Sequence, residues 1–266
     1  LLKQGRGWVV DADIKGYFDT IPQEQLLARV AEQISDGEVL ELLRRFLKQG
    51  VMESGKDWQP TEQGTPQGAV ISPLLANIYL NPLDHAMAQK GHQMVRYADD
   101  FVLLCESQEA AQQVLEQVRQ WMGTAGLTLH PTKTRIVNAN EKGGFDFLGY
   151  HFERGYRWPR TKSLNKLKDT IRGKTSRLRS GSMGEIIQEV NRMLKGWFEY
   201  FKHSHRTTFG PLDKWIRQRL RSILRKRHKG IGRARGRDHQ RWPNAYFAEL
   251  GLFSLAIART QAANSK

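Results

Sequence analysis

Cysteine is nearly absent from the sequence, which holds Cys105 alone among 266 residues. One cysteine excludes an internal disulfide bond and a zinc site made of several cysteines. Because Cys105 follows Leu104 in an apolar, strand-like segment, we expect it to be a small core residue. We also find no secretory signal and no apolar run long enough to span a membrane. The sequence therefore predicts a reducing, cytoplasmic setting of the bacterial type and no membrane partner.

Acidic residues are scarce in the second half of the chain. Residues 1–150 hold 14 Lys+Arg against 19 Asp+Glu, a net charge of −5, whereas residues 151–266 hold 28 against 8, a net charge of +20. Such a positive field attracts polyanions. A basic half beside an acidic half is typical of an enzyme that holds a nucleic acid, and the alternative is a merely basic protein.

Hydrophobic periodicity divides the chain into two parts. Strand and helix patterns interleave in residues 1–150, which indicates an α+β layer. We expect strands or hairpins at residues 7–14, 51–59, 94–104, 127–129, 135–137 and 145–152, and helices at residues 23–34, 36–48, 72–83 and 107–126. From about Thr161 the pattern is helical and basic, with a capping box at Ser182 and Glu185. The Gly/Arg-rich residues 229–241 predict a loop that a ligand orders.

Two adjacent carboxylates, Asp99 and Asp100, stand between apolar segments and predict a hairpin with an acidic tip. Their mutual repulsion is costly unless a cation lies between them. Mg²⁺ with oxygen ligands would remove that cost. A solvated acidic turn is the alternative, and the short Tyr-Ala-Asp-Asp string does not decide between them.

A third carboxylate, Asp13, ends the strand predicted at residues 7–14. If this strand and the acidic hairpin share one sheet, three carboxylates converge and can hold two Mg²⁺ ions. One ion would activate an attacking 3′-hydroxyl and the other would stabilise the triphosphate and leaving oxygens. The protein would then mainly position groups and neutralise charge. Asp11 and Asp19 are alternatives to Asp13, since strand alternation places Asp11 and Asp13 on the same face.

Two further features could contact nucleic acid. The Gly-rich residues 63–69 enter the helix predicted at Ser72, so their backbone could approach a phosphate or a base closely. An ordinary loop-to-helix junction is the alternative. The basic residues that we predict to face outward or to lie in the Gly/Arg-rich run, and to bind RNA, are Arg192, Lys195, Lys214, Arg217, Arg221, Arg225, Lys226, Arg227, Arg233, Arg235 and Arg237.

Five segments stand in the order of the palm motifs of reverse transcriptases. They are Asp-Ile-Lys-Gly-Tyr-Phe-Asp (13–19), Gly-Thr-Pro-Gln-Gly (64–68), Tyr-Ala-Asp-Asp (97–100), Gly-Leu-Thr-Leu (126–129) with Lys-Thr (133–134), and Phe-Leu-Gly-Tyr (147–150). The variants resemble the group II intron reverse transcriptase/maturase family, and residues 190–201 and 212–221 look like its maturase (thumb, or X) domain. The resemblance covers essentially the whole chain. It implies a palm, an antiparallel sheet packed on helices with a remnant of the fingers, at residues 1–155, and an all-α thumb/maturase domain at residues 156–266.

The resemblance also implies a role for each matched residue. Asp13, Asp99 and Asp100 match the catalytic carboxylates, and with Ile14 they would be the metal ligands. Phe18 matches the aromatic residue that crowds a 2′-hydroxyl and so favours deoxynucleotides. Gln67 and Gly68 match residues at the incoming nucleotide, and Lys133 matches a lysine near the triphosphate that can protonate the leaving pyrophosphate. Phe147, Leu148 and Gly149 match the primer-gripping hairpin.

The implied function is that of the RNA-directed DNA polymerase of a group II intron. Its partners would be intron RNA, an RNA template with a DNA primer, and deoxynucleoside triphosphates. We expect an N-terminal truncation, because the family's fingers region before the first motif is missing, and we find no cysteine-bearing endonuclease domain. A maturase that binds RNA without polymerising, after losing that activity through truncation, is therefore the alternative. A third possibility, an RNA-templated RNA polymerase, is disfavoured by Phe18. The oligomeric state is not predicted.

Overall fold

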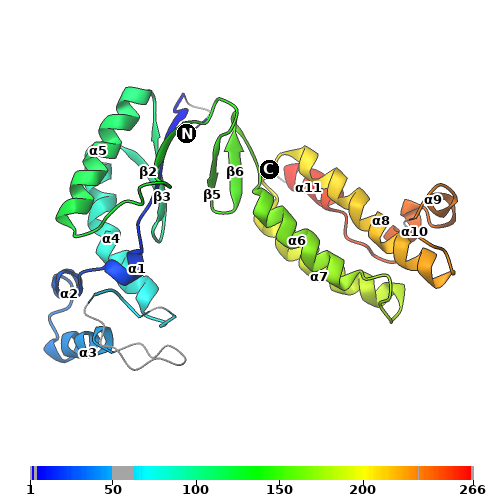
Figure 1. The fold of residues 1–266 in the computed structure, drawn as a ribbon, viewed down its shortest axis with the longest axis horizontal. Coiled ribbons are helices and arrows are strands. Elements are labelled where there is room, and N and C mark those ends of the chain that lie inside the picture. The colour runs from blue at the N-terminus through cyan, green and yellow to red at the C-terminus, as the bar shows by residue number, and fades with distance from the viewer. Residues whose placement is uncertain (1, 3–4, 50–62, 67, 233, 265–266) are drawn as a thin grey trace. The chain divides into compact units, whose positions relative to one another are not determined.

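The computed structural model describes residues 2, 5–49, 63–66, 68–232 and 234–264. The chain divides into two compact units, one that ends at Phe147 and one that begins at Leu148 (Figure 1). Strands and helices interleave in the first unit, and helices dominate the second, so the predicted α+β fold class is confirmed. None of the described helices combines the length and apolar character that crossing a membrane requires.

An antiparallel four-stranded sheet forms the centre of the first unit. Its order is β2–β3–β1–β4, with β1 at Trp8–Asp13, β2 at Gln93–Tyr97, β3 at Asp100–Cys105 and β4 at Arg135–Asn138. Strand β1 lies between β3 and β4, and its residues Val9 and Val10, which point to opposite faces, are both fully buried. The strand predicted at residues 7–14 and the acidic hairpin are therefore neighbours in one sheet.

Two long helices, α4 (Ser72–Gln89) and α5 (Gln108–Thr124), pack against one face of this sheet. Alternation along β1 directs Val10 and Ala12 into the shared core, so Asp11 and Asp13 lie on the other face. Helix α5 begins after Ser107, whose hydroxyl accepts a hydrogen bond from the Ala110 main-chain N–H at 3.1 Å. The chain thus keeps its carboxylates clear of the helices.

Three shorter helices precede α4. They are α1 (Tyr17–Thr20), α2 (Gln23–Ala31) and α3 (Gly37–Leu47), so the helices predicted at residues 23–34 and 36–48 are confirmed with slightly shorter bounds. Helix α3 starts where Asp36 caps it, accepting hydrogen bonds from the N–H groups of Glu38 and Val39. The hairpin predicted at residues 51–59 lies outside the described residues.

The strand predicted at residues 127–129 is wrong. Leu129 makes only an isolated bridge with Ile14. The segment crosses the end of β1, where the Lys15 N–H donates to Thr128 and the His130 N–H donates to Asp13. It then turns and returns as β4, which pairs with β1. This path places the segment after Leu129 next to Asp13.

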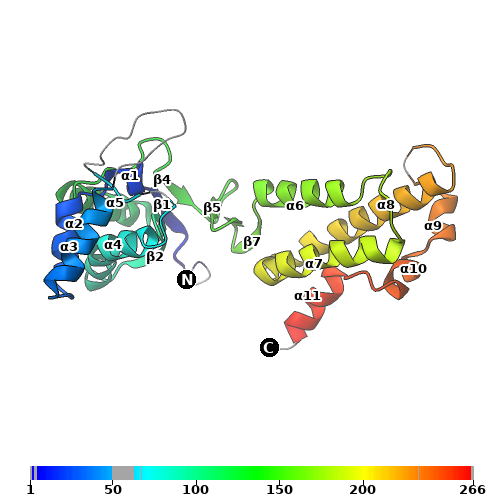
Figure 2. The same cartoon turned by 90° about the horizontal axis from the view of Figure 1, so that it is seen from below.

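The second unit begins with a hairpin and continues as helices. Its elements are β6 (Tyr150–Glu153), β7 (Tyr156–Pro159), α6 (Thr161–Lys174), α7 (Met183–Phe201), the 3₁₀ turn η2 (Arg206–Thr208), α8 (Phe209–Arg227), α9 (Arg237–Arg241), α10 (Asn244–Glu249) and α11 (Leu255–Asn264), whereas β5 (Phe145–Phe147) belongs to the first unit. Helices α6, α7 and α8 lie side by side around a second apolar core (Figure 2). Their apolar stripes form this core.

Local hydrogen bonds define two helix ends in this unit. Ser182 and Glu185 form the predicted capping box at the start of α7. The loop predicted over residues 229–241 is partly wrong, because its last five residues form α9. Asp238 explains this difference, since its carboxylate accepts from the Arg235 N–H at 2.7 Å and from Arg225 at 2.5 Å. These bonds hold the chain in a turn that the helix continues.

A buried carboxylate on α8 holds the start of α11. Asp213 is 5% exposed and accepts from the Ser254 hydroxyl at 2.7 Å and from the N–H groups of Leu255 and Ala256 at 3.0 and 3.1 Å. It therefore satisfies donors at a helix N-terminus that would otherwise be unpaired. A charge in this position also interacts favourably with the helix dipole.

We expect Asp213→Ala to lower the free energy of unfolding by about 2–4 kcal/mol, because it leaves buried N–H donors without an acceptor. Urea denaturation followed by circular dichroism measures this change. Asp169→Ala is the matched control, since Asp169 pairs with Arg172 on the exposed surface of α6. Equal effects of the two substitutions would contradict the capping role.

Candidate active site

The pairing of β1 with β3 brings the predicted carboxylates together. Asp13 lies directly opposite Asp100 in the antiparallel register. Residues in such a pair point to the same face of the sheet, with Cβ atoms about 4.5–5.5 Å apart. Asp99 precedes Asp100 in the two-residue turn between β2 and β3. The three carboxylates thus stand at one end of one sheet.

The turn itself is strained. Ala98 has a φ of 54°, in the left-handed region that costs an L-residue roughly 1–2 kcal/mol. A residue with positive φ at the first central position fits the right-handed twist of a hairpin, and glycine is usual there. Strain of this kind is often found where a functional group must be held in one place. Here the strained residue directly precedes Asp99.

Arg96 on β2 ties this turn to helix α4. Its side chain is 10% exposed and donates to both carboxylate oxygens of Asp84, to Asn77 Oδ1 at 2.9 Å and to the Ala98 carbonyl at 2.9 Å. The bidentate pair with Asp84 is a strong, directional contact. Arg96 was not predicted from the sequence, although a lone arginine in an apolar strand before an acidic turn indicates a residue that could hold the turn.

Lys133 contacts the first carboxylate. Its Nζ donates to Asp13 Oδ2 at 2.8 Å, while the His130 N–H donates to the Asp13 carbonyl at 2.7 Å. The side chains of Lys133 and Asp13 are 62% and 29% exposed, so this ion pair lies in contact with solvent. The ammonium group offsets negative charge at the position where a cation was predicted.

The donor set at this end of the sheet consists of carboxylate oxygens. Carboxylate oxygens are the hard ligands that Mg²⁺ takes, usually together with substrate phosphates. In the described part of the chain, however, no three Asp, Glu, His or Cys side chains are already grouped as a metal site. The residues therefore fit a cation by their chemistry and register, and a substrate would have to complete the coordination.

Asp11 has a different partner. It lies opposite Val102 and accepts from Arg135 Nε at 3.0 Å, with its side chain 16% exposed. Burial raises the pKa of Asp11, and the Arg135 guanidinium partly counteracts this rise. Asp13 differs, because it lies opposite Asp100. The register therefore favours Asp13 over Asp11 as the partner of the acidic turn.

The Gly-rich segment lies beside Phe18. The Thr65 N–H donates to the Phe18 carbonyl at 2.7 Å, and a Cβ on Gly64 would come within 2.6 Å of the same oxygen. Only glycine permits this approach. At Gly68 a Cβ would meet no described atom within 4 Å. Gln67 lies outside the described residues, so its predicted nucleotide contact stays a prediction.

The predicted primer grip spans the boundary between the two units, which falls after Phe147. Leu148 and Gly149 both have positive φ, as a tight turn requires. Within the second unit the Leu148 carbonyl accepts from Tyr200 Oη at 2.7 Å, and the Gly149 carbonyl accepts from the Arg160 N–H at 2.8 Å. The turn is therefore anchored on α6 and α7.

The basic residues predicted to bind RNA differ in their exposure. Arg192, Lys195, Lys214, Lys226, Arg235 and Arg237 are exposed, Arg217 is half-buried, and Arg233 lies outside the described residues. Arg225 and Arg227 reach solvent but also hold main-chain carbonyls of neighbouring loops, at Ile231 and Gly181 respectively. The exposed group is free to meet a polyanion.

The outward orientation predicted for Arg221 is wrong. Its side chain is 3% exposed and donates to the Trp242 carbonyl at 2.8 Å and to Asn244 Oδ1 at 2.7 Å. Burial lowers the pKa of Arg221. The helix pattern did not show this, because residues 242–244 fold back over α8. Arg221 is thus a structural residue, which holds the start of α10.

Comparison with known proteins defines the class. The family described as "Reverse transcriptase (RNA-dependent DNA polymerase)" matches residues 2–152, more than half of the chain. A second family, "Group II intron, maturase-specific domain", matches residues 164–242. With both segments in this order, the chain belongs to the group II intron reverse transcriptase/maturase family. Reverse transcriptases generally use divalent metal ions.

Individual relatives agree with this assignment. Protein YkfC of Escherichia coli K12 is 32% identical over 182 residues, which are 55% of this chain and 47% of YkfC. The group II intron-encoded protein LtrA of Lactococcus lactis is 45% identical over 87 residues, 32% of this chain and 14% of LtrA. The chain thus spans half or less of these proteins. Apo telomerase from Candida tropicalis has a TM-score of 0.50 at 14% identity, covering 81% of this chain and 46% of the telomerase, which shows the fold alone.

We expect Arg96→Met to lower the free energy of unfolding by about 1–3 kcal/mol, because Asp84 and the Ala98 carbonyl lose a buried donor. It should also speed amide hydrogen exchange in the Ala98 turn. Arg119→Met is the control, since Arg119 pairs with Glu116 on the solvent face of α5. An unchanged exchange rate at the turn would show that Arg96 does not hold it.

Proposed function

We propose that the chain is the palm and thumb of the RNA-directed DNA polymerase of a group II intron. It would add deoxynucleotides to a primer 3′-hydroxyl, and it would bind intron RNA to assist splicing and mobility. The pairing of Asp13 with Asp100, beside Asp99 in the turn, carries this proposal. Residues 1–155 would be the palm and residues 156–266 the thumb/maturase domain.

Asp13, Asp99 and Asp100 would hold two Mg²⁺ ions, together with the carbonyl oxygen of Ile14. When bound, such ions activate the 3′-hydroxyl and stabilise charge on the leaving oxygens. The chain's own residues would align the reactants, which is most of the work in phosphoryl transfer. The Arg96 contact supports this function, because it fixes the carboxylates before the substrate arrives.

Several residues would bind and select the nucleotide. Phe18, beside Gly64, would crowd a 2′-hydroxyl and so favour deoxynucleotides, and Gln67 and Gly68 would contact the nucleotide. Lys133 Nζ lies against Asp13, from where Lys133 would donate a proton to the leaving pyrophosphate. Phe147, Leu148 and Gly149 would hold the primer terminus. The RNA template, the DNA primer and the intron RNA would lie along the exposed basic residues.

One observation favours a second candidate, a maturase that binds intron RNA without polymerising. The Lys133 ammonium group lies against the Asp13 carboxylate, where the first candidate places a metal ion. The basic second half would suffice for RNA binding. In this case the carboxylates would be dispensable for splicing.

Primer extension on an RNA template with Mg²⁺ tests the first candidate. We expect Asp99→Ala and Asp13→Asn to reduce cDNA synthesis by at least about a hundredfold, because metal ions contribute several kcal/mol. Asp11→Asn is the control and should change the rate only a few-fold, since Asp11 binds Arg135. Full activity of Asp99→Ala would overturn the site. Splicing without any cDNA synthesis, unaffected by Asp99→Ala, would establish the second candidate.

RNA binding distinguishes exposed from buried arginines. We expect the double variant Arg192→Ala, Lys195→Ala to bind RNA with a weaker salt dependence. The slope of log association constant against log salt concentration should become less negative by up to about 2, because two phosphate contacts are lost. Thermal stability should stay the same. Arg221→Ala should instead lower the melting temperature, since Arg221 is buried. An unchanged slope in the double variant would remove these two residues from the RNA-binding surface.

A further inference from the structure

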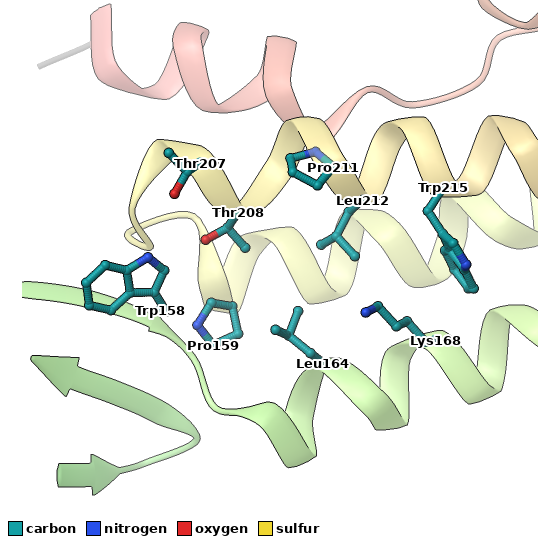
Figure 3. A pocket seen from close by; sticks show the side chains of 9 residues that line it. All are labelled: Trp158, Pro159, Leu164, Lys168, Thr207, Thr208, Pro211, Leu212 and Trp215. Atoms are coloured by element: carbon teal, nitrogen blue, oxygen red, sulfur yellow. The ribbon is translucent and has the colours of Figure 1, made fainter. Parts of the chain in front are cut away.

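A small pocket lies between the first turns of α6 and α8, within the second unit. Its volume is about 270 Å³ (Figure 3). Leu164 and Leu212 supply apolar surface, and Trp158 and Trp215 stand at opposite ends of it. These residues lie outside the palm motifs, and Leu164, Leu212 and Trp215 fall within the maturase-specific match at residues 164–242. The pocket therefore has a mainly apolar lining with an aromatic ring at each end.

Both tryptophan rings are half-buried and supported from behind. The Trp158 ring contacts the rings of Tyr156 and His205, with centroids 5.9 and 5.8 Å away. The Trp215 ring is covered by the Arg172 guanidinium, which lies 5.8 Å from the ring centroid. Rings held in this way offer a fixed stacking surface and lose little entropy when a ligand binds.

Two polar groups at this pocket lack a partner. Thr208 Oγ1 is buried and has no hydrogen-bond partner in the described structure, and Figure 3 shows it directed toward Trp158. A buried hydroxyl without a partner is costly, and it can both donate and accept. The Lys168 ammonium group lies between α6 and α8 and makes no ion pair with any described residue. A ligand with an anionic group would therefore pair with Lys168, and a polar atom of the same ligand would form a hydrogen bond with Thr208.

We propose that this pocket binds one unpaired nucleobase of an RNA strand, whose phosphate lies at Lys168. The proposal rests on the RNA binding proposed above. Aromatic faces combined with lysine and arginine are the means by which proteins hold single-stranded RNA. The volume of about 270 Å³ lies close to the lower end of the roughly 300–1,000 Å³ of small-molecule sites, which limits the ligand to a small group such as one base.

A second pocket indicates the path of the strand. Its volume is about 530 Å³, and Arg172, Arg177 and Lys226 line it. Arg172 also lies over the ring of Trp215, which lines the aromatic pocket, so this arginine connects the two pockets. The strand would place a base on the tryptophans and its neighbouring phosphates in the basic pocket. The net charge of +20 in residues 151–266 favours RNA over an apolar protein segment as the ligand.

A series of heptanucleotide RNAs, each with one abasic position, tests the proposal on the whole protein. We expect one position at which loss of the base weakens binding about tenfold, because stacking of a base is lost there. Trp158→Leu and Trp215→Leu should abolish that position effect, whereas Trp158→Phe should retain it. Thr208→Val, which removes only the hydroxyl, should reduce it.

The controls separate this proposal from the general RNA binding. Lys168→Ala should weaken binding of all the RNAs, and Lys90→Ala, at an exposed position in the other unit, should not. Circular dichroism shows whether each variant is folded. Equal affinity for all the abasic RNAs would overturn the base pocket while RNA binding stands. If the protein bound no RNA, both the proposed RNA binding and the base pocket would be overturned. If a saturating concentration of nucleoside monophosphate displaced no RNA, this result would count against the base pocket.

Discussion

The alignment of β1 with β3 is the constraint on which the first unit depends. It places Asp13 opposite Asp100, and like charges in such a pair destabilise a sheet. The chain tolerates them because Lys133 lies on Asp13 and because the rest of β1 is deeply buried. A slip of one residue would turn Asp13 toward the helices and Ala12 toward solvent. The apolar core therefore holds the carboxylates in place.

The arginines and lysines of the second unit perform two physical tasks. Arg221 and Arg225 are hydrogen-bonded to the chain and hold its later segments, at Trp242 and Ile231. Arg192 and Lys195 extend from α7 into solvent. Both groups contribute to the net positive charge of the second unit, but only the exposed side chains can contact a phosphate. Charge alone therefore does not measure the size of an RNA-binding surface.

Local patterns predicted much of the fold. The amphipathic stripes gave α2, α3 and α5 within a few residues, and Ser182 with Glu185 gave the start of α7, because these signals depend on neighbours in sequence. The strand predicted at residues 127–129 was wrong, because a short apolar segment does not show whether a partner strand lies alongside. Helix α9 was not predicted, because Arg225, twelve residues before it, supplies a stabilising contact to Asp238.

By itself, the sequence determined the family, the order of its motifs, and the residue types that can bind Mg²⁺ and nucleotides. These properties reside in short segments whose chemistry does not depend on distant contacts. Only the tertiary structure decided that Asp13 rather than Asp11 faces Asp100, that Arg96 holds the turn, and that Arg221 is buried. It also assembled Trp158, Lys168, Thr208 and Trp215 into one pocket. Each of these outcomes depends on strand register or on helices that meet across the chain, and no local pattern specifies such contacts.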